Sequence, residues 1–455
     1  MKTLTKGKMW IYAIGQLGWS ILSGLIGSWL VYFYQPNQEA LDDGMIQLVP
    51  QGRIVLGILT IIGLVTATGR VFDAITDPLV GNWSDKCKNK LGRRIPFMRW
   101  SAIPLGLVFV LIFCAPVQKI SGINSVWLFA TVLGYYFLIT CYCTPYTSLL
   151  AELPHNQDEK LKLSMSISLT FIIGTCIGYA APMMWGAMMG AGMARIPAMR
   201  IIFAILSLIG TICMLVPAFG INEKDYCEAK PSESNVMSSL GKTFKNKNFR
   251  VFVYQDIIYF FGLAMFQTGL PFFVTTKSLL GLPESYTTVM FGGLTLLSLL
   301  FYPFVTKMTA KWGKKKLLVA AFGGFVLTFT ITGLSGAMLG LPVMVQAVLI
   351  VVLGSFPQAI FGIIPQTIVA DIAQSDEIVT GESRSGMFYA ARTFAMKLGQ
   401  SLALLMFTSL ATIGSNGFGY RVVALVAAAC CLAGGIIMSF FNEKKVNDII
   451  NSVNK

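Results

Sequence analysis

Long apolar stretches and short polar segments alternate along the whole chain. A helix that crosses a lipid bilayer needs about 20 predominantly apolar residues, and the stretches of that length predict about twelve transmembrane helices. Several stretches exceed the minimum, which indicates helices that tilt or that extend beyond the bilayer. We expect the helices at residues 9–34, 53–82, 97–117, 125–151, 163–190, 200–222, 250–277, 285–306, 316–338, 343–373, 385–411 and 419–441.

The longest polar segment between these helices divides them into two sets of six. It covers residues 223–249 and is rich in Lys, Ser and Asn. We therefore predict an N-terminal six-helix bundle at residues 1–222, a central cytoplasmic loop, and a C-terminal six-helix bundle with a short tail at residues 250–455.

The two halves resemble a divergent repeat. TPYTSLLAEL in the fourth predicted helix corresponds to IPQTIVADIA in the tenth, so that Glu152 corresponds to Asp371 after a slip of one residue. GNWSDKCKNKLGRRIPF after the second helix likewise corresponds to FVTKMTAKWGKKKLL after the eighth. Two related six-helix halves around a midplane site are typical of secondary transporters. The pattern thus predicts an all-α membrane protein with two pseudo-symmetric six-helix bundles.

The composition and the charge distribution support a membrane protein. Only 12% of the residues are charged and 55% are hydrophobic, against about 25% charged residues in soluble domains. The net charge of +14 comes from Lys and Arg clusters between apolar stretches, which is the pattern of positively charged cytoplasmic loops and not of a nucleic-acid surface. We therefore expect both termini in the cytoplasm and no nucleic-acid partner. The Lys and Arg residues outside the cytoplasmic segments are then Arg53, Lys119, Arg195, Arg200, Lys277 and Arg421 near the opposite surface, and Arg70, Arg392 and Lys397 within the membrane.

The second predicted helix carries the most informative motif, GRVFDAITDPLVGNWSD. Asp73 and Asp77 are four residues apart, so both carboxylates project from one helix face. Each charged group inside a membrane costs about 2.5–3.5 kcal/mol, and two like charges need compensation. A salt-bridge network with Arg70 and Lys397 would provide it. Alternatively, the two carboxylates with Thr76 bind Na+ through hard oxygens, or one of them holds a proton.

The loop after this helix predicts a cytoplasmic latch. Asp85 can accept hydrogen bonds from a neighbouring helix end, and Arg93 and Arg94 can pair with acids such as Glu152. Together with Gly81, these residues form a cluster that would favour the outward-open state of a transporter. The alternative is that the loop only anchors the topology.

These motifs resemble the glycoside–pentoside–hexuronide:cation symporters, the melibiose-carrier branch of the major facilitator superfamily. GRVFDAITDP with GNWSD and GRRIPF, PYTSLLAEL, and the segment from IVADIAQSDE to Lys397 carry the resemblance, which spans most of the chain. It implies the major facilitator fold and coupling to Na+, H+ or Li+ at Asp73 and Asp77. Thr76 stands where the melibiose carrier has Asn, while Thr140, Thr393 and Lys397 match positions near the cation and sugar sites.

The chain departs from the melibiose carrier at its charged sugar-binding residues. Leu17, Cys143 and approximately Ile167 stand where that carrier has Asp, Asp and Arg, groups that form strong contacts with hydroxyls. Other polar or aromatic residues on the same or facing helices are candidate replacements, although packing or interfacial roles are the alternative for many of them. The candidate solute contacts are Gln16, Trp19, Tyr32, Tyr136, Tyr142, Cys143, Tyr146 and Gln267.

The sequence therefore predicts a secondary active cation:solute symporter that works by alternating access. We expect a glycoside, oligosaccharide or uronide as solute, with a lysolipid or another organic solute as the alternative cargo. No nucleophile–base set, zinc spacing or phosphate-binding glycine loop is evident, so we do not expect an enzyme. Na+ or H+ as coupling ion, no further cofactor, a monomer and a bacterial inner membrane complete the prediction.

Overall fold

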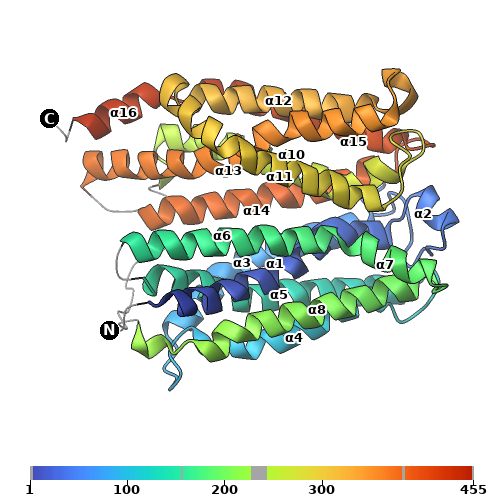
Figure 1. Ribbon diagram of the computed structural model, residues 1–455, viewed down its shortest axis with the longest axis horizontal. Helices are drawn as coiled ribbons and strands as arrows, with labels where there is room; N and C mark the ends of the chain where they lie inside the picture. Colours follow the sequence, from blue (N-terminus) through green and yellow to red (C-terminus); the bar gives the residue numbers. More distant parts are fainter. Residues whose placement is uncertain (1–3, 155–156, 227–242, 382–384, 453–455) are drawn as a thin grey trace. The chain divides into compact units, whose positions relative to one another are not determined.

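The computed structural model describes residues 4–154, 157–226, 243–381 and 385–452, and within them all long regular elements are helices. The chain forms two compact units, Met1–Glu233 and Ser234–Lys455. Figure 1 shows that each unit is a bundle of long helices lying roughly side by side. The boundaries predicted for the central loop stay a prediction, since residues 227–242 lie outside the described ranges.

Unit 1 contains six membrane-length segments, of which the fifth is divided into two helices. Its elements are α1 (Lys6–Tyr34), α2 (Gln38–Asp42), α3 (Ile61–Asp85), α4 (Ile95–Phe113), α5 (Gly122–Glu152), α6 (Gln157–Tyr179), α7 (Ala181–Gly190), α8 (Arg195–Gly220) and the short η1 (Glu223–Asp225). Pro182 at the start of α7 lacks the amide hydrogen that a continuous helix would use, which fits the break after Tyr179.

Unit 2 repeats this order of six long helices. Its elements are α10 (Lys247–Thr275), α11 (Ser285–Trp312), α12 (Lys314–Leu334), η2 (Gly336–Leu339), α13 (Val343–Thr380), α14 (Ser385–Leu410), α15 (Phe418–Ser439) and α16 (Glu443–Asn451). The first unit pairs α1 with α6 and α8, and the second pairs α10 with α14 and α15. The contacts within the two units thus follow a common plan.

Ten helical spans in the described residues are long and apolar enough to cross a membrane on these criteria alone. The other two long helices are α3 and α14. Charged residues lower their hydropathy: Arg70, Asp73 and Asp77 in α3, and Arg392 and Lys397 in α14. The two helices that resemble membrane spans least are therefore α3 and α14, each of which carries two or more charged residues in its interior.

Two of the predicted helix boundaries differ most from the structure. The second helix begins at Ile61 rather than at residue 53, because Leu56 and Gly57 adopt positive φ angles of 53° and 70° in a turn, and Thr60 then caps the helix. The tenth helix extends to Thr380 rather than to residue 373, since its polar end continues the same helix until Gly381 in the left-handed conformation stops it. Apolar length alone does not reveal either boundary.

Candidate functional site

Two carboxylates of α3 face two threonines of α5 in a regular ladder. The Thr140 hydroxyl donates to Oδ1 of Asp73 at 2.5 Å, and the Thr144 hydroxyl donates to Oδ1 of Asp77 at 3.0 Å. Each pair is four residues apart on its helix, so the two contacts follow one another by one helical turn. Thr144 was not predicted, although its spacing from Thr140 repeats the spacing of the aspartates.

The ladder lies well inside the helices that carry it. Asp73 is 6% exposed and Thr140 is 1% exposed. A rise of 1.5 Å per residue places both about 18 Å from the ends of their helices at Asp85 and Glu152. The Thr76 hydroxyl lies 3.4 Å from that of Thr140 and bonds the carbonyl of Phe72. The site therefore gathers carboxylate and hydroxyl oxygens, the hard donors that Na+ prefers.

Arg70, predicted as a counter-charge, lies over an aromatic ring. Its guanidinium carbon is 5.4 Å from the centroid of Tyr136. The buried Nε of Arg70 has no hydrogen-bond partner among the described residues. The role of Arg70 as a counter-charge for the aspartates stays a prediction.

Thr393, a predicted coupling residue, and Lys397, the other predicted counter-charge, lie on α14 of unit 2. Thr393 is exposed and bonds the carbonyl of Tyr389 on its own helix, and Lys397 is half-buried. The predicted contact of Lys397 with the aspartates would join the two units, so it stays a prediction.

Unit 2 holds a buried ion pair that sequence reasoning missed. Arg392 of α14 donates from Nε to Oδ2 of Asp256 at 2.8 Å, and its Nη2 lies 3.5 Å from Oδ1. Asp256 is fully buried and Arg392 is 8% exposed. Arg392 is recognisable in the sequence as a charge within the membrane, but its partner depends on the pairing of α10 with α14.

Two tyrosines predicted to contact solute, Tyr142 and Tyr146, form hydrogen bonds between helices of unit 1. The Tyr142 hydroxyl donates to the carbonyl of Met214 at 2.8 Å, and the Tyr146 hydroxyl donates to that of Tyr12 at 2.8 Å. Tyr12 in turn donates to the carbonyl of Tyr146, and both predicted tyrosines are fully buried. In this conformation they join helices, and their contact with solute stays a prediction.

The remaining predicted solute contacts have varied surroundings. Gln16 bonds Ser20 on the same helix at 3.0 Å. Trp19 packs against Phe171, and its buried indole nitrogen has no hydrogen-bond partner in the described residues. Such a buried donor is uncommon, which makes Trp19 the strongest of these candidates in unit 1. Tyr32 and Tyr136 are buried, and Cys143 and Gln267 are half-buried.

The residues of the predicted latch meet at the end of unit 1 where α3 and α5 end and α4 begins. Arg94 Nη2 contacts Asp85 at 2.5 Å and Glu152 at 3.0 Å, and Arg93 Nη2 contacts Glu152 at 3.2 Å. This cluster joins the ends of α3 and α5 to the start of α4. Gly81 lies one turn before Asp85, and a Cβ there would meet Thr144 only at an ordinary 3.7 Å.

Glu223, which sequence reasoning missed, completes this cluster. Its carboxylate accepts the backbone N–H groups of Arg93, Arg94 and Ile95 at 2.9, 2.8 and 3.2 Å. These are orphan donors at the N-terminus of α4, where a negative charge is also favoured by the helix dipole. Glu223 therefore fastens the segment after α8 to the beginning of α4.

Unit 2 repeats this arrangement. The Glu443 carboxylate accepts the backbone N–H groups of Lys314 and Lys315 at 2.7 and 3.0 Å, at the start of α12. Lys314 pairs with Asp371 of α13, the residue that the sequence repeat matches to Glu152. The missed signal was the tripeptide Asn-Glu-Lys, which follows the sixth long helix of each half.

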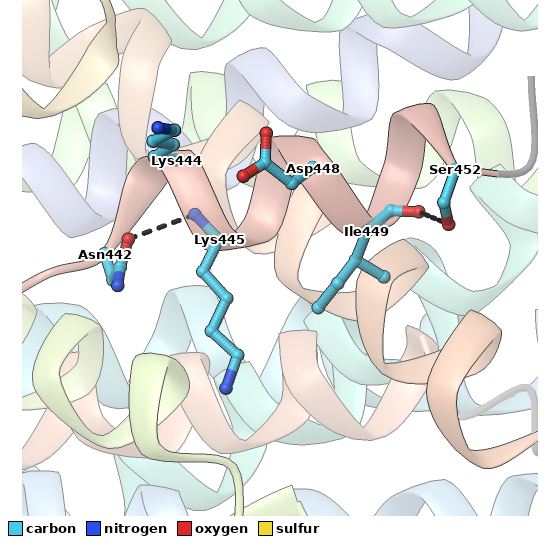
Figure 2. A pocket seen from close by; sticks show the side chains of 6 residues that line it. All are labelled: Asn442, Lys444, Lys445, Asp448, Ile449 and Ser452. Atoms are coloured by element: carbon cyan, nitrogen blue, oxygen red, sulfur yellow. Dashed lines mark hydrogen bonds between the residues drawn. The ribbon is translucent and has the colours of Figure 1, made fainter.

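The helix that begins with this glutamate also borders a surface hollow. Figure 2 shows its lining residues along α16, with the Asn442 side chain accepting the Lys445 backbone N–H at 3.0 Å. None of the predicted site residues lines the hollow. The hollow is therefore separate from the candidate site.

Known proteins similar to this chain are transporters. The family model described as MFS/sugar transport protein matches residues 11–445. The uncharacterized symporter YnaJ of Bacillus subtilis is 23% identical over 86% of this chain and 79% of its own length. The isoprimeverose transporter of Lactiplantibacillus pentosus is 22% identical over 55% of this chain and 49% of its own length.

A solved structure with the same fold is the inward-open xylose transporter XylE from E. coli. It is 13% identical, the match covers 98% of each chain, and the TM-score is 0.64. This likeness and the family match confirm the predicted all-α major facilitator fold. The chain therefore belongs to the MFS/sugar transport protein family, in the glycoside–pentoside–hexuronide branch of the major facilitator superfamily that its motifs predicted.

Proposed function

We propose that this protein is a cation:solute symporter in which Asp73 and Asp77 bind the coupling cation. The observation that carries the proposal is the ladder between α3 and α5. Two carboxylates and three threonine hydroxyls are gathered at membrane depth. Charged groups at that depth cost free energy of insertion and commonly mark ion pathways.

The same oxygens suit either of two coupling ions. Na+ would bind between the carboxylates and the hydroxyls of Thr76, Thr140 and Thr144, while a proton would neutralise one carboxylate of the pair. We propose Na+ or H+ as the coupling ion. Because the contacts of Thr140 and Thr144 bring oxygen atoms of two successive helical turns together, the arrangement suits an ion that bridges the two turns.

The family and the relatives favour a sugar as the solute. We propose a glycoside or a small oligosaccharide, since the isoprimeverose transporter is among the similar proteins. The aromatic and amide groups near α1, among them Trp19 and Gln16, are the proposed contacts for the sugar ring and its hydroxyls.

Transport by purified protein in lipid vesicles tests the proposal. Na+ and H+ gradients are imposed separately, and accumulation of isoprimeverose and other neutral glycosides is followed beside counterflow without a gradient. One gradient should drive accumulation, and dissipating it should leave only exchange. Accumulation that ignores both gradients would contradict symport.

We also propose a bacterial inner-membrane location with both termini in the cytoplasm, because Lys and Arg concentrate in the segments assigned to that side. Reporter fusions at residue 230 and at the C-terminus should both read cytoplasmic. A periplasmic signal at either position would reverse the orientation or change the number of spans.

A further inference from the structure

We propose that Arg392 is a solute-binding residue, positioned by Asp256, and that it recognises the hydroxyl groups of an uncharged glycoside. The inference rests on the proposed function as a solute carrier and narrows its substrate class. It assigns the recognition of the solute to a guanidinium of unit 2.

The first observation is the depth of the ion pair. Asp256 lies roughly 13 Å and Arg392 roughly 10 Å from the first residue of its own helix, at 1.5 Å per residue. Both residues are therefore inside membrane-length helices. Ion pairs at helix ends fasten loops, whereas charged side chains inside membrane helices mark solute and ion pathways.

The second observation is the rigid setting of the guanidinium. Phe252, Asp256 and Phe260 are spaced by four residues and share one face of α10. The guanidinium carbon lies 5.8 and 5.9 Å from the two ring centroids. A Cβ at Gly399 would lie 2.4 Å from the carbonyl of Ile257, so α10 and α14 are in close backbone contact here. The two rings and the Asp256 carboxylate therefore surround the guanidinium in this conformation.

The third observation concerns the nitrogen atoms of Arg392 that bond Asp256. Its hydrogen bonds to Asp256 involve Nε and Nη2, while a guanidinium has five N–H donors in one plane. In a side-on contact through Nε and Nη2, Nη1 takes no part, and the residue as a whole is 8% exposed. Nη1 can donate two hydrogen bonds to oxygen atoms of a solute.

The charge of the pair selects the class of solute. Asp256 neutralises the guanidinium, so a second carboxylate would gain little net attraction and would lose its hydration. A hydroxyl loses less on desolvation and accepts the same hydrogen bonds. The pair therefore favours a neutral sugar over a uronide.

Equilibrium binding to the full-length protein in lipid nanodiscs tests this proposal. The probes are isoprimeverose and two matched pairs, methyl glucoside with methyl glucuronide and methyl galactoside with methyl galacturonide. Wild-type protein should bind the neutral member of a pair more tightly. Arg392→Lys should weaken neutral binding about tenfold, the equivalent of one lost hydrogen bond.

Asp256→Asn gives the decisive result, because it leaves the guanidinium uncompensated. The affinity ratio should shift toward the uronide by about tenfold or more, as one ionic contact replaces a neutral one. A pair with a purely structural role would lower binding of both members equally, and that result would overturn the proposal.

The double variant Asp256→Asn with Arg392→Gln controls for folding, since it replaces the ion pair by a neutral amide pair. It should fold, lose neutral binding and gain no affinity for uronides. Wild-type affinity in this variant, tighter uronide binding by the wild type, or no binding of any neutral probe would each sink the assignment. Because no gradient is applied, failure of cation coupling would leave the binding result intact.

Discussion

Each unit buries carboxylate groups in a membrane-length helix, but the groups that face them differ. In unit 2, Asp256 faces the guanidinium of Arg392. In unit 1, Asp73 and Asp77 face the hydroxyls of Thr140 and Thr144. A guanidinium carries a permanent positive charge, whereas a hydroxyl supplies a hydrogen bond and a further oxygen ligand. One arrangement thus suits a fixed pair, and the other suits a charge that arrives and leaves.

We expect the largest difference between the two carboxylate sites in ion-coupled uptake of solute. Asp77→Asn should reduce gradient-driven uptake in vesicles to the level of vesicles without protein, because it removes the charge that binds the cation. Counterflow should partly survive. Asp256→Asn should retain ion dependence with any solute that it still binds. Loss of ion dependence in both variants would contradict the assignment of cation binding to unit 1 alone.

The next effect concerns stability. Asp256→Ala leaves the Arg392 guanidinium buried without its partner, which should cost about 3–5 kcal/mol of unfolding free energy. Asp77→Asn keeps the acceptor for Thr144 and should cost far less. Thermal unfolding in the same detergent compares the two variants. Equal losses would mean that the carboxylates of unit 1 are also structural.

A smaller effect tests the threonine ladder. Thr140→Val keeps the side-chain shape but removes the hydroxyl that bonds Asp73, an interaction with a charged group worth about 1.5–3 kcal/mol. If Na+ is the coupling ion, the Na+ concentration for half-maximal uptake should rise by about tenfold or more. Thr147→Val is the control, since this exposed hydroxyl bonds only carbonyls of its own helix. An unchanged Na+ requirement in Thr140→Val would exclude this hydroxyl from the site.

The smallest effect concerns the ion-pair cluster of Asp85, Arg93, Arg94 and Glu152. Asp85→Asn weakens a contact with Arg94 in which the acid side chain is 34% exposed, so the change should be about 1 kcal/mol or less. We expect a modest shift toward inward-facing states, measured by the accessibility of a cysteine introduced on the periplasmic side. Constant accessibility would reduce the cluster to a topological anchor.

The sequence predicted the fold and part of the site for different physical reasons. Membrane helices are specified by local apolar length, so their number and order were readable from the chain. Asp73 and Asp77 were readable because their spacing defines one helix face. The role of Asp256 could not be predicted, because its ion pair with Arg392 depends on the packing of α10 on α14, which the sequence does not show.

The other residues that sequence reasoning missed show the same difference between local and long-range information. Glu223 and Glu443 accept hydrogen bonds from backbone N–H groups. Because every residue except proline has such a group, the sequence of the donating segment does not reveal the acceptor. The repeated Asn-Glu-Lys tripeptide was the available signal. Thr144 needed only the observation that the aspartate spacing recurs four residues beyond Thr140.

The positions of the two glutamates in the chain also set the order in which their contacts can form during synthesis. Each closes onto a helix made much earlier: Glu223 onto the start of α4, and Glu443 onto the start of α12. The ribosome therefore completes all of the long helices of a half before it delivers the residue that fastens them. Glu223 is translated before any long helix of the second half, whereas Glu443 follows all of them, so a nascent chain stopped before Glu443 would contain the acceptor for the start of α4 but lack the acceptor for the start of α12.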